Sequence, residues 1–507
     1  MRIAFHACTI GLLSAHGALA AVTISSAATR NMSCSNGVCA PTAKQAVLNA
    51  GDLEGFLASG NLAVTTTGSG VQADDIHVRS ALGWSNSSTL SLEAHRSIAI
   101  NAPVSITGLS GLALDTGKKR ALSFGGKGNV SFANLSSQLT INGAAYTLVA
   151  DIKTLAADIA ANPGGDFALA NNYDASADGT YSQPPIVTVF TGAFEGLGNA
   201  ISNFSIDGTI SINREFLEGL FAELGTNGLI ENIDLANANV TCSLRSAVKI
   251  VIVASLVAQN FGTVRDFSAS GAVRDQKPVP HLGGLVGWNH GTILSSHADV
   301  AVSAGRYGSV GGLANYNFGT ISKSYATGAV LGEFVGGLVA FNFGRVTDSF
   351  ATGDVQVTFP PEGKLVGGGL VEVNSDSGTI RNSYATGAVI GGEGSVIGGL
   401  VGENDNTVGF SYSTGAVTGG TASIMGGLIG KDSFALRGLF DNYWDTKTSG
   451  QSQGVGNIPN DRGVTGLTTA QFQSGLPHGF RRKVWTEKAN IIDGFPYLLS
   501  NPPPKPE

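Results

Sequence analysis

One short pattern is repeated through the second half of the chain and limits the folds that this sequence can adopt. Gly-Gly-Leu occurs six times, with steps of 28, 25, 32, 30 and 28 residues, and each copy leads into a block such as GTISKSYATGAV. The glycine pairs are Gly283-Gly284, Gly311-Gly312, Gly336-Gly337, Gly368-Gly369, Gly398-Gly399 and Gly426-Gly427. Weaker copies begin at Glu218 and Ala254. Self-similarity at a period of roughly 20 to 50 residues indicates a repeat protein, so we predict a repeat array over residues 218–450.

The residues inside each repeat favour strands. The blocks are short, alternate in polarity and are rich in Val, Ile, Thr, Tyr and Phe, and they lack the 3.6-residue apolar stripe of a helix. One repeat offers about three short strands and three turns, which suits a β-helix coil better than a propeller blade of ~40 to 45 residues. We predict an all-β fold, a right-handed parallel β-helix (β-solenoid) with one short helical insertion and a C-terminal cap. The paired glycines should lie where the backbone turns tightly or packs closely.

The sequence outside the array divides into further segments. Met1-Arg2, an apolar run from Ile3 to Leu13 and the small residues around Ala20 follow the order of an export signal, which we predict over residues 1–20. Asp151–Ala161 is predicted as a helix because its apolar residues share one face. The other predicted segments are a Ser/Thr/Ala-rich stretch (21–44), narrower β-solenoid coils (45–150), a helix with connecting strands (151–217), a C-terminal cap with a short helix at Thr468–Gln473 (451–500), and a disordered tail (501–507).

The four cysteines give information on whether the protein folds in an oxidising compartment, where disulfides form. Cys34 and Cys39 bracket a turn-like tetrapeptide, Ser-Asn-Gly-Val, and could close a small disulfide if the protein is exported. Cys8 lies within the predicted signal, and Cys242 is predicted to be buried.

The net charge and the hydropathy of the chain argue against nucleic-acid binding and against a membrane span. A formal charge of −7 and a pI near 5.6 give no electrostatic case for nucleic-acid binding. The two basic runs, Lys118-Lys119-Arg120 and Arg481-Arg482-Lys483, are interpreted as solvated loop charges. No stretch approaches the ~20 apolar residues of a spanning helix, so we predict no membrane span.

The acidic residues test whether the protein is an enzyme, because some polysaccharide lyases and hydrolases are parallel β-helices. Such enzymes need carboxylates clustered on one face, whereas the carboxylates of the array are scattered. Asp266 and Asp348 share a repeat position that elsewhere holds Lys323 and Asn382, which indicates a solvated edge. Asp74-Asp75 with His77 is interpreted as a turn. We predict no catalytic, cofactor-binding or metal-binding residues.

One column of aromatic residues is the main candidate for function. A single repeat position holds Tyr325, Phe350, Tyr384, Tyr412 and Tyr443 in five successive units. Equivalent residues of a parallel coil stack at about 4.8 Å. The column is either a ladder that fixes the register and stabilises the coils, or an exposed strip that docks sugar rings or a partner. Alternation along the strand does not decide which face is inside.

These features resemble a known group of bacterial proteins. The repeats resemble the GLUG motif, with GGLVG at 283–287 and NSYATGAV at 382–389. GAFEGLGNAISNFSI before the array, and NYWDTKTSG and GFPYLL after it, match the same group. TLSLEAHRSIAINAPV in the N-terminal third is similar to the coils of filamentous-haemagglutinin-type exoproteins.

The resemblance implies a bacterial, adhesin-like β-solenoid that is secreted or held at the cell surface. Its partners would be glycans or proteins of a host or of its own surface, and it implies no enzymatic activity. Two alternatives remain open at this stage: a carbohydrate-active β-helix enzyme, and a structural component of an extracellular matrix.

Overall fold

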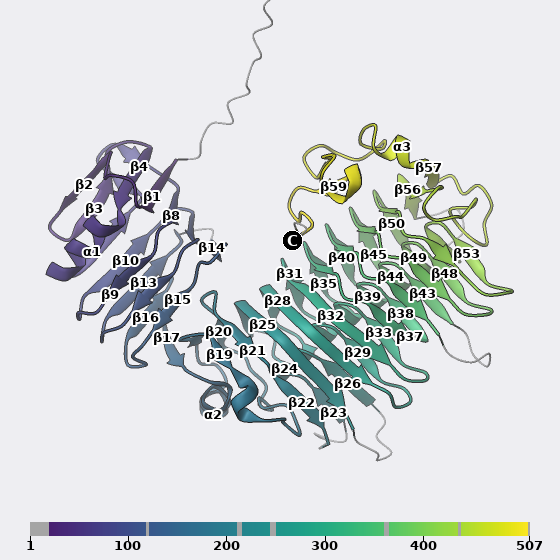
Figure 1. Ribbon diagram of the computed structural model, residues 1–507, viewed down its shortest axis with the longest axis horizontal. Coiled ribbons are helices and arrows are strands. Elements are labelled where there is room, and N and C mark those ends of the chain that lie inside the picture. Colours follow the sequence, from purple (N-terminus) through teal and green to yellow (C-terminus); the bar gives the residue numbers. More distant parts are fainter. Residues whose placement is uncertain are drawn as a thin grey trace, which may run out of the picture. The chain divides into compact units, whose positions relative to one another are not determined.

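The computed structural model describes residues 20–117, 121–209, 215–243, 250–358, 365–433 and 438–504. Most of the predicted export signal, the first basic run and the last three residues therefore lie outside the described residues. The chain divides into two compact units, Met1–Ala145 and Tyr146–Glu507. Each unit consists of short strands that pair in parallel from coil to coil (Figure 1), which confirms the predicted all-β parallel β-helix.

The first unit builds three sheets. One sheet contains β14 (Ala121–Phe124), β11 (Ser97–Ile100), β8 (Asp75–Val78), β1 (Ala21–Ser25) and β4 (Gln45–Asn49). Another contains β16 (Gln138–Ile141), β13 (Gly111–Asp115), β10 (Thr89–Glu93), β5 (Leu62–Thr65), β3 (Val38–Pro41) and β2 (Met32–Ser35), and the third contains β15 (Val130–Phe132), β12 (Val104–Ile106) and β9 (Leu82–Trp84). A small hairpin joins β6 (Thr67–Gly68) to β7 (Val71–Gln72). Because β1 to β3 belong to these sheets, the coils begin at residue 21 rather than at the predicted 45.

Two features of this unit bear on the sequence predictions. Cys34 lies opposite Cys39 in the antiparallel β2–β3 hairpin, and the two form a disulfide. The helix α1 (Ala50–Ser59) was not predicted; Asn49 caps it by accepting a hydrogen bond from the Asp52 amide, and Leu53 and Leu57 are buried. Gly51 and Gly55 fall inside this helix and lower its intrinsic helix propensity, so burial of its apolar side compensates.

The second unit opens with the helix α2 (Ile152–Ala161), which agrees with the predicted Asp151–Ala161. The Asp151 side chain caps it by accepting a hydrogen bond of 2.7 Å from the Thr154 amide, and Ile152, Leu155 and Ile159 are buried on one face. The strand β17 (Ala144–Val149) precedes this helix, and the connecting strands that follow it are β18 (Phe167–Leu169), β19 (Tyr173–Asp174), β20 (Ala193–Glu195), β21 (Ala200–Ser202) and β22 (Ser205–Gly208), with the 3-10 helix η2 (Ala175–Asp178).

Each coil of the array crosses three sheets, which we call the first, second and third faces. The first face contains β23 (Glu215–Glu218), β26 (Ile250–Ala254), β29 (His281–Gly283), β33 (Ser309–Gly311), β38 (Phe334–Gly336), β43 (Val366–Gly368), β48 (Val396–Gly398) and β53 (Ile424–Gly426). The second face contains β24 (Phe221–Leu224), β27 (Val257–Asn260), β30 (Val286–Asn289), β34 (Ala314–Asn317), β39 (Val339–Asn342), β44 (Val371–Asn374), β49 (Val401–Asn404) and β54 (Ile429–Asp432).

The third face begins with long strands and then breaks into shorter ones. It contains β25 (Leu229–Cys242), β28 (Thr263–Asp275), β31 (Thr292–Leu294), β32 (His297–Ala304), β35 (Thr320–Ser322), β36 (Tyr325–Ala326), β37 (Val330–Gly332), β40 (Arg345–Thr347), β41 (Phe350–Ala351), β42 (Val355–Val357), β45 (Thr379–Arg381), β46 (Tyr384–Ala385), β47 (Val389–Gly391), β50 (Thr407–Gly409), β51 (Tyr412–Ser413), β52 (Val417–Thr418), β55 (Leu439–Phe440), β56 (Asn442–Asp445) and β57 (Val464–Leu467). Cys242, at the end of β25, is buried as predicted.

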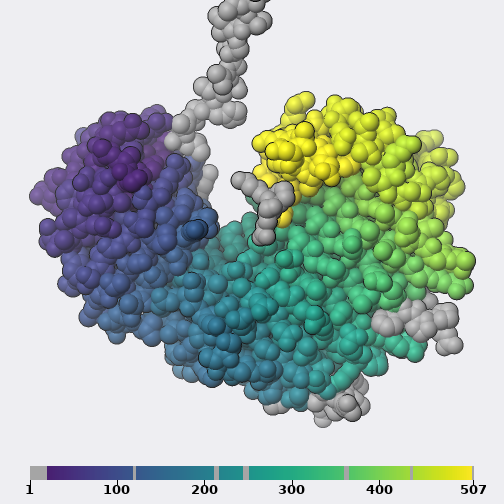
Figure 2. All heavy atoms as spheres, viewed as in Figure 1, coloured from purple at the N-terminus to yellow at the C-terminus, as the bar shows by residue number. Residues whose placement is uncertain are grey.

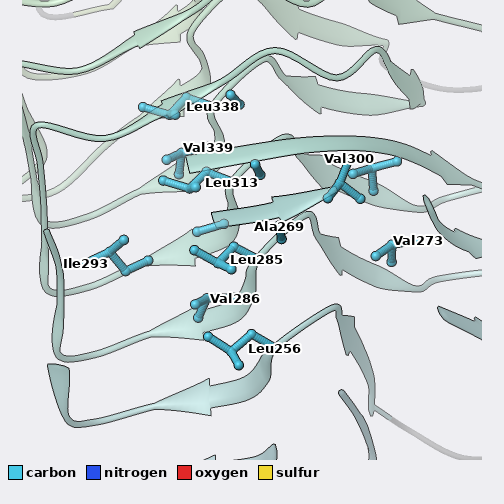
Figure 3. Packing of buried hydrophobic residues seen from close by; sticks show 14 of the residues in the cluster. Leu256, Ala269, Val273, Leu285, Val286, Ile293, Val300, Leu313, Leu338 and Val339 are labelled. Atoms are coloured by element: carbon cyan, nitrogen blue, oxygen red, sulfur yellow. The ribbon is translucent and has the colours of Figure 1, made fainter. Parts of the chain in front are cut away.

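The Gly-Gly-Leu pattern forms the corner between the first and second faces. The second glycine lies against the next coil: a Cβ on Gly337 would come within 2.0 Å of the Gly369 carbonyl oxygen. None of the paired glycines has a left-handed φ. Glycine is therefore required at these positions because the coils pack closely there. The backbone conformation at these positions would accept other residues. The leucines point inward and stack on one another, as Figure 3 shows for Leu256, Leu285, Leu313 and Leu338, all of them fully buried.

Two ladders of polar side chains tie the coils together inside the array. At the end of the second face, Asn Nδ2 donates to the Oδ1 of the equivalent residue in the next coil over 2.7–2.8 Å, in the series Asn260, Asn289, Asn317, Asn342, Asn374, Asn404 and Asp432. On the third face, backbone amides donate to side-chain oxygens one coil on, in the series Ser296, Ser324, Ser349, Ser383, Ser411 and Asn442. These bonds satisfy buried polar groups and fix the register of each coil.

The C-terminal cap contains α3 (Thr469–Phe472), β58 (Trp485–Thr486), the 3-10 helix η3 (Ile492–Gly494) and β59 (Tyr497–Leu498). The short helix α3 agrees with the predicted Thr468–Gln473 and carries a capping box between Thr468 and Gln471. The prediction of a disordered tail from residue 501 was wrong at its first residue. Asn501 is buried, and its side chain donates hydrogen bonds to the carbonyl oxygens of Ser324 and Asp348.

The close approach at the glycine corner gives a stability prediction. Gly337→Val should lower the free energy of unfolding by about 3 kcal/mol, because the new side chain overlaps the backbone of the next coil and overpacks the corner. The same change at Gly164 is the control. That residue is exposed, and a Cβ there meets only the Thr191 hydroxyl, at 3.7 Å. Urea unfolding should show the loss for Gly337→Val alone; equal midpoints for both variants would contradict the packing role.

Candidate binding surface

The predicted aromatic column exists and its rings stack. Adjacent ring centroids are 4.7 Å apart for Tyr325 and Phe350, 4.8 Å for Phe350 and Tyr384, and 5.1 Å for Tyr384 and Tyr412, with nearly parallel planes. Tyr443 pairs with Tyr412 in strand register. His297 extends the column by one coil, at 4.5 Å from Tyr325. This spacing matches that of paired parallel strands.

The column points away from the coil interior, and four of its five residues are nevertheless buried, whereas Tyr325 is half-buried. The neighbouring residues Ala326, Ala351 and Ala385 pack into the main core, whereas the rings form a separate cluster with residues of the C-terminal cap. The cap contributes Phe472, Phe480, Trp485, Phe495 and Leu498 to this cluster. Figure 2 shows the C-terminal residues, in yellow, lying against the green coils of the array. Tyr384 and Tyr412 are fully buried as a result.

Hydrogen bonds fix the cap along the column. The Tyr412 hydroxyl donates to the Pro496 carbonyl oxygen over 2.5 Å, and the Tyr443 hydroxyl donates to the His478 carbonyl oxygen over 2.8 Å. Asn501 reaches the coil of Tyr325 through the Ser324 carbonyl oxygen. The cap thus runs back over the column from its last member to its first. Of the two interpretations left open for these residues, the arrangement favours the stabilising ladder over the exposed docking strip, because the chain's own C-terminal segment occupies that surface.

A second set of aromatic rings lies on the outside of the second face. Trp288, Tyr316 and Phe341 hold one position of three successive coils, with ring centroids 5.5 Å and 4.8 Å apart. Beside them, at the corner with the third face, a parallel column stacks at 4.6, 4.6 and 5.1 Å through Phe261, His290, Phe318 and Phe343. We call these seven residues the aromatic platform.

The aromatic platform is open to solvent and has clear ends. Phe318 is 43% exposed, His290 is exposed, and the other five rings are half-buried. In the three following coils the position equivalent to Phe341 is occupied by Val373, Glu403 and Lys431. Sequence reasoning missed this surface. The signal was present, since an aromatic residue stands on each side of the ladder asparagine in Trp-Asn-His, Tyr-Asn-Phe and Phe-Asn-Phe at 288–290, 316–318 and 341–343.

Two imidazoles lie at the platform, those of His281 and His290. Burial lowers the pKa of His281. The ring of His290 is partly shielded from water between Phe261 and Phe318, which lowers its pKa as well, so both imidazoles are neutral near pH 7. The His281 Nδ1 lies 2.9 Å from the Ser309 hydroxyl, and its ring packs edge-on against Tyr316 at 5.4 Å. The platform therefore combines flat apolar rings with neutral hydrogen-bonding groups at one side.

The scattered carboxylates of the array remain apart. Asp266 and Asp348 occupy a corner position with left-handed φ of 49° and 50°, which Lys323 and Asn382 share at 51° and 49°. Asn382 Nδ2 donates to Asp348 Oδ1 over 3.1 Å. This position belongs to a corner, where Asn and Asp tolerate the left-handed conformation better than most residues.

The interpretation of Asp74-Asp75 with His77 as a turn was wrong for two of the three residues, because Asp75 and His77 lie in the strand β8. Burial alone would raise the pKa of Asp75, but hydrogen bonds from Arg96 and Ser97 lower it below its usual value. Within the described ranges no group of three or more His, Cys, Asp or Glu side chains is arranged to hold a metal ion.

One carboxylate pair that sequence reasoning missed lies inside the second unit. Glu195 and Glu231 are neighbours in strand register and are only 1% and 7% exposed. Glu195 accepts hydrogen bonds from the Leu197 amide and Asn232 Nδ2, and Arg265 pairs with Glu231. Burial, then the charge of Glu231, raises the pKa of Glu195 well above its usual range. Because both side chains are enclosed, a polymer substrate does not reach them.

Comparison with known proteins gives a partial likeness. No protein-family model matches this sequence. Halomucin of Haloquadratum walsbyi is 33% identical over 155 residues, which covers 30% of this chain and 1% of halomucin. The similarity therefore concerns a small part of a much longer protein. Among the described residues, no helix has both the length and the apolar character needed to cross a membrane. The repetitive parallel-β architecture fits a structural or surface repeat protein.

The covered column gives a paired prediction. Tyr412→Phe should cost about 1 kcal/mol of unfolding free energy, because it leaves the buried Pro496 carbonyl oxygen without its donor. Tyr384→Phe should be neutral or stabilising, since the buried Tyr384 hydroxyl has no partner among the described residues. Chemical denaturation of the two variants measures the difference, and a larger loss for Tyr384→Phe would contradict the arrangement of the cap.

Proposed function

We propose that this protein is an exported, non-enzymatic, adhesin-like β-solenoid of the GLUG-motif, filamentous-haemagglutinin-like type, and that it binds glycan chains through the aromatic platform. The observation that carries the proposal is the pair of adjacent, partly exposed ring columns on the second face and its corner, in which every contact is stacked except the edge-to-face contact of Trp288 with Tyr316. We assign docking to this platform and not to the Tyr325–Tyr443 column, for which it was one of two interpretations, because the cap occupies that column.

The platform has the physical properties that sugar binding needs. Aromatic rings offer large, rigid, apolar faces with little side-chain entropy to lose, and stacking on neighbouring coils holds these rings in place before a ligand arrives. Coils repeat at about 4.8 Å, a spacing comparable with the length of one sugar ring. A chain of sugars lying along the stacked coils would therefore meet equivalent contacts in successive coils, and its binding energy would be spread over several rings.

Two further features support an exported protein. The Cys34–Cys39 disulfide suits an oxidising compartment, and residues 1–20 have the order of an export signal. The likeness to a segment of halomucin also fits a repeat module that occurs within longer chains.

Two other functions are weighed against this one. A polysaccharide-cleaving enzyme would need accessible paired carboxylates, and the adjacent pair Glu195 and Glu231 is enclosed. A purely structural matrix component would need no exposed aromatic surface. The aromatic platform favours a binding role over that alternative.

Platform variants test the binding role. Trp288→Ala, Tyr316→Ala and Phe318→Ala should each weaken binding about three- to tenfold, and combined changes should weaken it further, because each ring contributes about 1 kcal/mol. The measurement is calorimetry against a panel of neutral hexasaccharides, namely cello-, manno-, chito- and galacto-oligosaccharides. Ile390→Ala is the control, since Ile390 is 46% exposed but lies on β47, outside the platform.

Two results would contradict the proposal: no binding to any member of the panel, or platform variants that bind as well as Ile390→Ala. Circular dichroism of each variant separates loss of affinity from loss of folding.

The acidic residues provide a test of the enzymatic alternative. No single change among Asp266→Asn, Asp348→Asn, Glu372→Gln and Glu403→Gln should abolish a function, because these residues hold separate positions along the array. A reducing-end assay on purified protein with the same oligosaccharides should show no cleavage. Cleavage that depends on one of these acids would replace the binding role with catalysis.

A further inference from the structure

Two adjoining hollows lie where the C-terminal cap meets the corner of the last coils. One, of about 550 Å³, is lined by Leu439, Phe440, Asp441, Asp461, Arg462 and Gly463. The other, of about 190 Å³, is lined by Arg381, Asn382, Phe410, Gly479, Arg481 and Val484. They adjoin because the Phe410 and Phe440 rings meet edge to face at 5.0 Å, and because Gly479 lies against the Asp441 carboxylate. We call the two together the cap groove.

Three arginines border the cap groove with their charges available. Arg381, Arg462 and Arg481 are all exposed, and none has a carboxylate partner among the residues that the structure describes. Arg381 is held in place, because its guanidinium carbon lies 4.9 Å from the centre of the Phe440 ring. Arg481 begins the basic run Arg481-Arg482-Lys483, which the sequence alone assigned to solvated loop charges.

The acidic residues of the groove are engaged in part: Asp441 pairs with His478, and Asp461 uses one carboxylate oxygen, whereas its buried Oδ2 has no partner among the described residues. Asp441 Oδ1 lies 3.1 Å from His478 Nδ1, and Asp461 Oδ1 accepts a hydrogen bond of 2.8 Å from the Gly463 amide. Both carboxylates and Arg462 line the larger hollow, and Arg381 and Arg481 line the smaller one, so the groove as a whole has one more positive than negative group and the excess lies at the smaller hollow. The chain itself has a formal charge of −7. A free guanidinium recognises a carboxylate or sulfate through two parallel hydrogen bonds.

We infer that the cap groove binds an acidic sugar, with the anionic group on the arginines and the ring against Phe410 and Phe440. The larger hollow lies within the size range of small-molecule sites. A nucleic acid fits less well, because a long phosphate backbone would extend beyond the three arginines onto a negatively charged protein. The groove is separate from the aromatic platform, so this inference does not depend on the proposed function.

Calorimetry at 150 mM NaCl with an oligogalacturonate as the probe tests the inference. Arg381→Gln and Arg462→Gln should each weaken binding about tenfold, because each removes a charge-assisted hydrogen-bonding group. Arg306→Gln is the matched control: Arg306 is also exposed and lies 5.3 Å from the centre of an aromatic ring, that of Tyr307, but it lies outside the groove. Tyr316→Ala, on the platform, should bind the probe like the wild type.

Further probes separate the sources of the anion. Binding of a sulfated oligosaccharide with the same dependence on Arg381 would extend the ligand class to sulfate esters and support the inference. An oligonucleotide of equal charge that binds as tightly as the galacturonate would overturn it. Absence of galacturonate binding, or an equal effect of Arg381→Gln and Arg306→Gln, would also overturn it.

Discussion

The stacking of each coil on the next at the spacing of paired strands is the constraint on which the rest of this structure depends. Backbone hydrogen bonds fix that spacing at about 4.8 Å, so every side chain must fit beneath its own equivalent. At the Gly-Gly-Leu corner the carbonyl of the next coil leaves no room for a Cβ. Inside, the asparagine and serine ladders turn the same repetition into continuous hydrogen bonding. The repeat sequence is therefore the direct result of backbone geometry.

The same repetition creates columns of like side chains on the outside, and what covers a column decides its role. The column from Tyr325 to Tyr443 is covered by the cap and forms with it a second apolar cluster on the outside of the third face. The column from Trp288 to Phe341 has a similar spacing, with an edge-to-face contact between Trp288 and Tyr316 and a stacked one between Tyr316 and Phe341, and it remains partly exposed. Two chemically similar columns thus serve stability in one case and, as we propose, recognition in the other.

The repeat period and the strand-like blocks predicted the fold, and the capping residue and apolar face of α2 predicted that helix. The covering of the Tyr384 column was not predictable, because alternation along a strand gives two faces without saying what lies against the outer one. The cap residues Phe472, Trp485 and Phe495 follow no period, so nothing in their spacing assigns them to that column. The platform corresponds to a recognisable sequence pattern, aromatic–Asn–aromatic. That pattern indicates exposed rings only if the asparagine is known to point inward. The helix α1 was missed because two glycines within it weaken the helical signal.

The central claim is that the Tyr384 column is enclosed by the cap while the platform is open to solvent. Hydroxyl-radical footprinting of the native protein, read by mass spectrometry residue by residue, tests this claim most directly. The account predicts rapid oxidation of Phe318 and Tyr316, and protection of Tyr384 and Tyr412 until the protein is unfolded. Oxidation of Tyr384 and Tyr412 in the native protein at the rate of Phe318 would contradict it.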